Sequence, residues 1–201
     1  MAAGGISIDT VYQTVLALAN KEQRGYISPQ EFNLYANHAQ MEVLEQYFYD
    51  LSQFRQMSSD KIQYSDMVDL LEEKIQIFES VLGANAVANL PGAGQGGINK
   101  RLPNDVYRVH RVELNNTECE LLSTRDFNDF RRSTRMLAPT NDRPIANIRS
   151  GVVRVVGDGG NFITPTGIFY TRVPNRVQWG YVVVNEKALY DANPAKTTNF
   201  E

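Results

Sequence analysis

The residues best suited to chemistry are a single cysteine, Cys119, and two histidines, His38 and His110. A thiol beside an imidazole can act as a nucleophile, and imidazole is a common metal ligand. Neither histidine has a second histidine or a cysteine three or four residues away, which is the spacing that favours a metal site. Cys119 lies in a short alternating segment, where a buried apolar thiol is the simplest interpretation. We expect no catalytic residue, no cofactor and no metal, and an enzyme using Cys119 or His110 stays open as an alternative.

Three glycines, Gly92, Gly94 and Gly97, match the spacing of a dinucleotide-binding loop. That loop requires a strand before it and, after it, a helix whose N-terminus binds the pyrophosphate. Here a helical pattern precedes the glycines, and residues 99–103 (NKRLP) do not begin a helix. The segment also lacks the Gly-Lys-Ser/Thr of a P-loop. We interpret it as a linker and not as a cofactor site.

Charge is divided unevenly along the chain. The net charge is −3, but residues 1–82 carry 5 basic and 12 acidic side chains, whereas residues 83–201 carry 15 basic and 11 acidic ones. Opposite charges on two halves favour association between copies. Solvated faces without any partner are the alternative, and the sequence alone does not separate the two.

The basic residues of the second half include a group of three arginines, Arg131, Arg132 and Arg135. Such a group could bind nucleic acid, but free-standing DNA binding depends on net neutralisation of phosphates, which a pI near 5.5 disfavours. We expect these arginines to form salt bridges to an acidic neighbouring subunit instead.

Residues 1–82 predict an antiparallel helical bundle. Apolar residues recur at helical spacing from Ile8 onward, and residues 28–31 (SPQE) form a capping box with proline at the first helical position. A long second helix is predicted over residues 29–56, and a third helix follows with Asp66 as its N-cap.

The second predicted helix carries three consecutive aromatic residues, Tyr47, Phe48 and Tyr49. Successive side chains on a helix point about 100° apart, so these three cannot all face one core. We expect at least one of them to contact another chain, where a tyrosine ring packs while its hydroxyl stays hydrated. A single exposed aromatic without a partner is the alternative interpretation.

The composition changes after residue 82. Residues 83–102 are interpreted as a glycine-rich linker or loop, in which residues 83–99 are expected to make few contacts with a core. Residues 103–201 are interpreted as a β-rich domain with a short helix and an extended C-terminal tail. A change of phase near Arg111 predicts a β-bulge, and Asn115-Asn116 predicts a hairpin turn. The short helix is expected over residues 124–132 with Thr124 as its cap. The predicted fold class is therefore α+β: an N-terminal antiparallel helical bundle followed by a mainly antiparallel β-rich domain.

The sequence shows no sign of a membrane span or of export. No apolar run approaches the roughly 20 residues that cross a bilayer, and the first residues lack the basic and apolar regions of a signal peptide. We expect a cytosol-like compartment and no membrane partner.

Several segments resemble structural proteins of crAss-like and related tailed phages. The most specific is residues 16–33, and the others agree with it when they are taken together. In chain order they are LALANKEQRGYISPQEFN (16–33), LPNDVYR (102–108), VP (173–174), WGY (179–181) and TNFE (198–201).

This resemblance implies a head–tail connector or adaptor. Such a protein forms a closed ring, dodecameric by analogy with connectors, at the portal vertex of the virion after assembly in the host cytoplasm. Its partners would be other copies of itself, the portal protein and neighbouring tail or ring proteins, and packaged DNA would pass through without sequence-specific binding. The family role carries no catalytic residues. Another virion protein, such as a capsid stabiliser, is an alternative.

Overall fold

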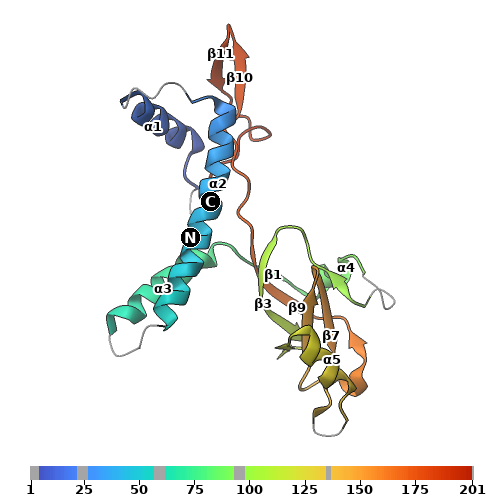
Figure 1. Cartoon of the computed structure of the whole chain (residues 1–201). Coiled ribbons are helices and arrows are strands. Elements are labelled where there is room, and N and C mark those ends of the chain that lie inside the picture. Colours follow the sequence, from blue (N-terminus) through green and yellow to red (C-terminus); the bar gives the residue numbers. More distant parts are fainter. Residues whose placement is uncertain (1–4, 22–26, 57–61, 93–97, 135–136, 201) are drawn as a thin grey trace. The chain divides into compact units, whose positions relative to one another are not determined.

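The computed structural model describes residues 5–21, 27–56, 62–92, 98–134 and 137–200. The fold is α+β, with N-terminal helices followed by mostly antiparallel sheets (Figure 1). The chain divides into two compact units. The helical unit comprises residues 1–77 and 174–201, and the sheet unit comprises residues 78–173. The C-terminal segment therefore returns to the helices, which differs from the division at residues 82 and 102 expected from the sequence.

The helical unit contains α1 (Ile8–Lys21), α2 (Pro29–Gln56) and α3 (Ile62–Gln76). The capping box at the start of α2 is formed: the Ser28 amide donates to the Glu31 carboxylate at 3.0 Å, and the Glu31 amide donates to Ser28 Oγ at 3.3 Å. The hydrogen bonds from the Ser28 hydroxyl and amide lower the pKa of Glu31. The start of α3 differs from the expectation, because the helix already begins at Ile62 and Asp66 lies inside it.

The three helices share two small cores. Leu51 of α2 packs against Leu71 and Ile75 of α3. These two helices run antiparallel, since Tyr47 lies near Lys74 and Arg55 pairs with Glu72 (Figure 1). The second core joins α1 and α2 to the C-terminal segment, and its buried residues are Ile8, Tyr12, Phe32, Ala36, Val177 and Trp179. Burying apolar side chains from both ends of the chain is what closes the helical unit.

The described residues of the sheet unit form two sheets, the short α-helices α4 (Ala84–Asn89) and α5 (Thr124–Arg132), and a 3-10 helix (Asp158–Gly160). The first sheet has the order β1-β9-β3-β4, and the second has the order β2-β7-β6-β5, with β8 beside β7. All of its strand pairs are antiparallel except β5 with β6. The strands are β1 (Glu79–Leu82), β2 (Lys100–Arg101), β3 (Val106–Leu114), β4 (Thr117–Glu118), β5 (Glu120–Leu121), β6 (Ile145–Arg149), β7 (Val152–Val156), β8 (Phe162–Ile163) and β9 (Gly167–Arg172).

Three local predictions in the sheet unit are resolved by its geometry. The register of β3 against β9 shifts between Val109 and Arg111, which confirms the bulge. Asn115 and Asn116 have φ values of 51° and 65° and turn β3 into β4, which confirms the hairpin. Helix α5 has the expected bounds, but its N-cap is Ser123 and not Thr124, since Ser123 Oγ accepts the Asp126 amide at 3.3 Å.

The expectation that residues 83–99 make few core contacts is wrong. Val87 of α4 is fully buried in the core of the sheet unit, because one apolar side chain on this short helix faces the sheets. Lys100 is also buried and its Nζ donates to the Ala88 carbonyl at 3.1 Å. Strand β2 follows the glycines, so no helix begins there. Gly94 and Gly97 themselves lie outside the described residues.

Candidate interaction surface of the helical unit

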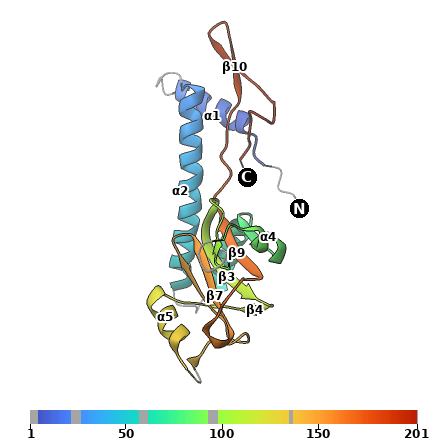
Figure 2. The ribbon, with the colours of Figure 1, turned by 90° about the vertical axis from the view of Figure 1, so that its right-hand side faces the viewer.

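An extended stretch after β9 binds to α2 through two asparagine side chains. Asn33 accepts the Trp179 amide at 2.7 Å and donates to the Trp179 carbonyl at 3.2 Å. Asn37 does the same for Val177, at 3.0 Å and 2.9 Å. Helical residues four apart are separated by about 6.0 Å along the axis, and extended residues two apart by about 6.6 Å, so the two spacings nearly match. Figure 2 shows this stretch running alongside α2.

Trp179 anchors the stretch in the core between α1 and α2. Its ring lies 4.3 Å from that of Tyr12, which in turn lies 4.8 Å from Phe32. Its indole N–H donates to the Asp9 carboxylate at 2.9 Å. The side chain is 2% exposed. Burial of a large aromatic with its polar atom satisfied is a strong source of binding free energy.

The last residues of the chain complete the same site. Gln178 and Thr198 exchange two backbone hydrogen bonds, at 3.0 Å and 2.8 Å. The Ile8 amide donates to Asn199 Oδ1 at 3.2 Å, which satisfies a donor at the start of α1. The Phe200 amide donates to the Ile6 carbonyl at 3.2 Å. The C-terminal segment is therefore held at both of its ends.

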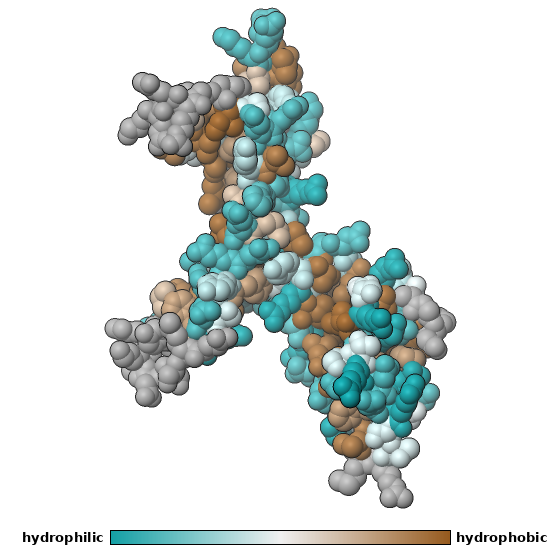
Figure 3. Space-filling view, in the orientation of Figure 1, coloured by the Kyte–Doolittle hydropathy of each residue, from teal (hydrophilic) through white to brown (hydrophobic). Residues whose placement is uncertain are grey.

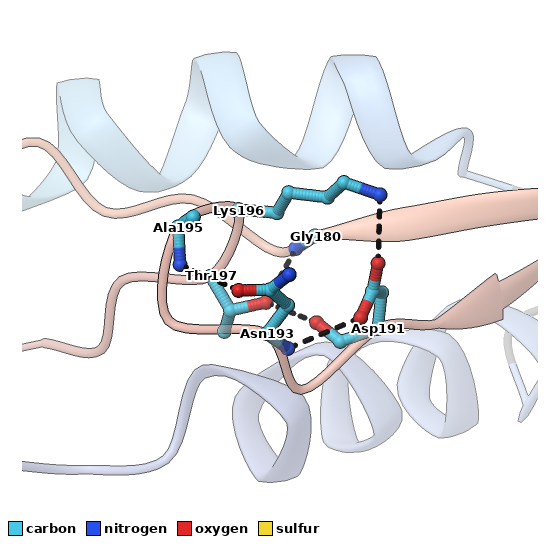
Figure 4. A network of polar contacts seen from close by, with 6 residues as sticks. All are labelled: Gly180, Asp191, Asn193, Ala195, Lys196 and Thr197. Atoms are coloured by element: carbon cyan, nitrogen blue, oxygen red, sulfur yellow. Dashed lines mark hydrogen bonds and ion pairs between the residues drawn. The ribbon is translucent and has the colours of Figure 1, made fainter.

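A polar turn supports the segment between these ends (Figure 4). Asp191 accepts from Lys196 Nζ at 2.9 Å and from the Asn193 amide at 3.1 Å, and these two contacts lower its pKa. Thr197 Oγ1 accepts the Gly180 amide at 3.2 Å. A Cβ on Gly180 would lie 2.4 Å from that oxygen, so only glycine fits here.

A two-stranded hairpin of β10 (Tyr181–Val184) and β11 (Lys187–Tyr190) projects from this site. Tyr181 and Ala188 pack on the core at its base, whereas Val183 is 62% exposed. No third strand pairs with β10 or β11 in the part of the chain that the structure describes. Figure 3 shows the apolar surface below a hydrophilic tip. The exposed apolar residues are Val182, Val183, Val184, Leu189 and Tyr190.

An isolated hairpin of this kind is marginally stable in water, and an exposed apolar edge is prone to pair with another chain. The hairpin is therefore the first candidate for an interface. A second lies on α2, where Leu34, Tyr35 and Tyr49 are exposed on the side away from the buried residues.

The three aromatic residues predicted at an interface are separated by the structure. Tyr47 and Phe48 are half-buried and pack on the core between α2 and α3. Tyr49 points to solvent and is 63% exposed. One of the three thus lies outside the core, and its contact with another chain stays a prediction.

Of the three arginines predicted to contact another subunit, one already has partners within its own chain. The Arg131 guanidinium lies 4.1 Å from the centre of the Phe162 ring, and its Nε donates to the Gly160 carbonyl at 3.2 Å. Arg131 therefore already has partners within the sheet unit. Arg132 is exposed at the end of α5. Arg135 lies outside the described residues.

The residues considered for chemistry are buried or paired with a neighbouring side chain. Cys119 is 2% exposed, and burial, followed by the charges of Glu113 and Glu118, raises its pKa to about 12. A thiol in that state is not a nucleophile at neutral pH. His110 Nε2 is hydrogen-bonded to Thr171 Oγ1 at 2.5 Å, and His38 pairs with Glu42 at 3.3 Å. Within the described ranges, no group of three ligand-type side chains could hold a metal ion.

Sequence reasoning missed the residues that bind the C-terminal segment: Asp9, Asn33, Asn37 and Trp179. A signal was present, because the two asparagines lie four residues apart in the long helix beside the apolar stripe.

No protein-family model matches the chain, and no curated protein is significantly similar to it. None of the described helices combines the length and the hydropathy that a bilayer crossing needs.

Proposed function

We propose that this protein is a structural subunit of a tailed-phage virion that forms a closed ring at the head–tail junction. The ring would extend the DNA channel from the portal and offer a platform for the tail proteins. Its partners would be copies of itself, the portal and the adjacent tail or ring proteins. The connector role itself is inferred from the sequence resemblance described above.

The observation that carries the proposal is the apolar hairpin β10–β11. Two strands whose outer edges have no partner among the described residues carry its exposed apolar side chains, Val182, Val183, Val184, Leu189 and Tyr190. Soluble monomers generally avoid such edges, whereas subunits cover them in an assembly. Burial of Cys119, which raises its pKa to about 12, gives no support to the enzyme alternative.

Charge supports self-association as well. The helical unit carries 8 basic and 14 acidic side chains, a net charge of −6, and the sheet unit carries 12 basic and 9 acidic ones, a net charge of +3. Opposite charge on two parts of one subunit favours head-to-tail contacts, which must close into a ring or continue as a filament.

Electron microscopy tests the proposal. The purified full-length chain should form closed rings, and an epitope tag on it should be found at the portal vertex of native particles. A tag distributed over the capsid would favour a capsid stabiliser instead. Absence of the chain from the particle would refute a virion role.

A further inference from the structure

The C-terminal segment, residues 174–200, completes the helical unit although it is separated in sequence from α1–α3 by the whole sheet unit. We propose that this segment binds the α1–α2 site of a neighbouring copy, so that adjacent copies are linked by exchange of their C-terminal segments. The inference rests on the proposed function only in taking the chain to be a subunit of a closed assembly.

The binding contacts do not depend on which copy supplies the segment. Asn33 and Asn37 bind main-chain groups of Trp179 and Val177, and Asp9 accepts the indole N–H. All three acceptors belong to α1 and α2, and the groups that they bind belong to the segment. An identical set of contacts is therefore available between two copies, and only the connection to the sheet unit distinguishes the two arrangements.

That connection is short. The Val173 amide is held in the sheet unit by the Asp105 carbonyl at 2.6 Å, and Val177 is already held by Asn37. Three residues, Pro174, Asn175 and Arg176, connect these two hydrogen-bonded positions. From Val173 to Val177 the chain can span at most about 14 Å.

Proline makes the connection stiffer. Pro174 fixes its own φ and restricts Val173 to extended conformations, which disfavours a tight reversal at this point. In the structure the segment binds the helices of its own chain across this connection. Short, stiff hinges of this kind favour exchange of the segment when copies are held close together in an assembly. The same short reach means that the accepting helices must belong to an immediate neighbour, so each exchange links one copy to the next.

The segment of a second copy fits the α1–α2 site. The site takes a buried valine followed, two residues later, by a tryptophan whose N–H meets a carboxylate. The chain has a single tryptophan, and every other copy presents the same Val177 and Trp179.

Cross-linking between copies tests the exchange. Gln30 Nε2 of α2 lies 3.3 Å from the Tyr181 hydroxyl of the segment. Two differently tagged full-length variants, Gln30→Cys and Tyr181→Cys, are co-expressed and treated with a short bismaleimide. We expect a cross-linked product that carries both tags. The matched control replaces Tyr181→Cys by Lys187→Cys at the hairpin turn. The native chain serves as a second control and should give no product, because its cysteine, Cys119, is buried.

The hinge supplies an independent measurement. The structure shows the segment bound within one chain, so a Gly-Ser-Gly-Ser-Gly-Ser insertion after Pro174, which lengthens and loosens the hinge, should favour this closed form over exchange. The molar mass in solution should then fall to that of one chain. Cross-linking confined to single chains, or an oligomer whose mass the insertion leaves unchanged, overturns the exchange. Rings that form without exchange would leave the proposed function standing, whereas exchange in a chain located away from the portal vertex would refute that function alone.

Discussion

The indole N–H of Trp179 donates a hydrogen bond of 2.9 Å to the carboxylate of Asp9, which lies 170 residues earlier in the chain. This bond joins the first turn of α1 to the C-terminal segment. The tryptophan is buried, so its N–H would otherwise have no access to water. Stability of the helical unit should therefore respond to changes at either end of the sequence.

Replacing Asp9 by alanine should destabilise the helical unit by about 1–3 kcal/mol, because the buried indole N–H loses a charged acceptor. Urea unfolding followed by the fluorescence of Trp179, the only tryptophan, measures the loss. Thr10→Ala, at an exposed position next to Asp9, is the control and should change stability by less than about 0.5 kcal/mol. Equal effects of the two substitutions would contradict this role of Asp9.

Replacing Asn37 by alanine should free the backbone of Val177, since both of its hydrogen bonds to that residue are lost. We expect a cost of about 1–3 kcal/mol and faster hydrogen exchange at the Val177 amide. Gln46→Ala, on an exposed part of α2, is the control. An unchanged exchange rate in Asn37→Ala would show that the asparagine does not hold the segment.

Removing the apolar surface of the hairpin should weaken assembly without unfolding the chain. Val182 and Leu189 face each other across β10 and β11, so Val182→Lys together with Leu189→Glu replaces two apolar groups by an ion pair that preserves the hairpin. Sedimentation velocity should show smaller species, while the thermal transition stays near that of the native chain. Full assembly of this double variant would mean that the hairpin is not an interface.

Reversing the charge of Arg132 should weaken assembly at low salt and have less effect at high salt, because salt screens contacts between charged surfaces. Arg132 is chosen over Arg131 because Arg131 also packs on Phe162. Arg149→Glu, at another exposed arginine of the sheet unit, is the control. The measurement is oligomer mass as a function of ionic strength, and an identical salt response of native and variant chains would argue against the contact.

Burial of Cys119 should make its thiol slow to react. Its pKa is raised from 9.0 to about 12, so at pH 8 the thiolate fraction is about a thousandfold smaller than for an ordinary thiol. Reaction with a disulfide reagent should be slow in the native state and fast in urea. Because the folded state holds this proton more tightly, the contribution of Cys119 to stability is complete below pH 9 and is lost as the pH rises toward 12.

Local signals explain why much of the fold could be predicted. The capping box at Ser28 and Glu31 defines the start of α2, and the paired asparagines at 115 and 116 define a turn, because each depends on neighbours within a few residues. The N-cap of α5 was misplaced by one residue, since Ser123 and Thr124 are both good caps and only geometry separates them.

The contacts between residues far apart in the sequence could not be predicted from periodicity. Val87 looked like part of a linker because its helix has only six residues, too few for a periodic pattern. The site on α2 depends on Asn33 and Asn37 meeting residues about 140 positions later. Sequence spacing shows that the two asparagines share a helix face, but not which main-chain groups they bind.

Side-chain amides recognise any peptide group alike, so the two asparagines cannot by themselves tell which residues of the tail lie over them. A slip of the C-terminal segment by two positions would offer Asn33 and Asn37 equivalent main-chain partners, but it would move the indole out of its place between Tyr12 and Asp9. The indole of Trp179 therefore determines which residues of the C-terminal segment lie over the two asparagines. Four helical residues span about 6.0 Å and two extended residues about 6.6 Å, so the difference adds up with each further asparagine–main-chain pair. This limits such an arrangement to a few consecutive pairs. A C-terminal segment without this tryptophan would therefore stay bound to α2 but could take more than one alignment along the helix.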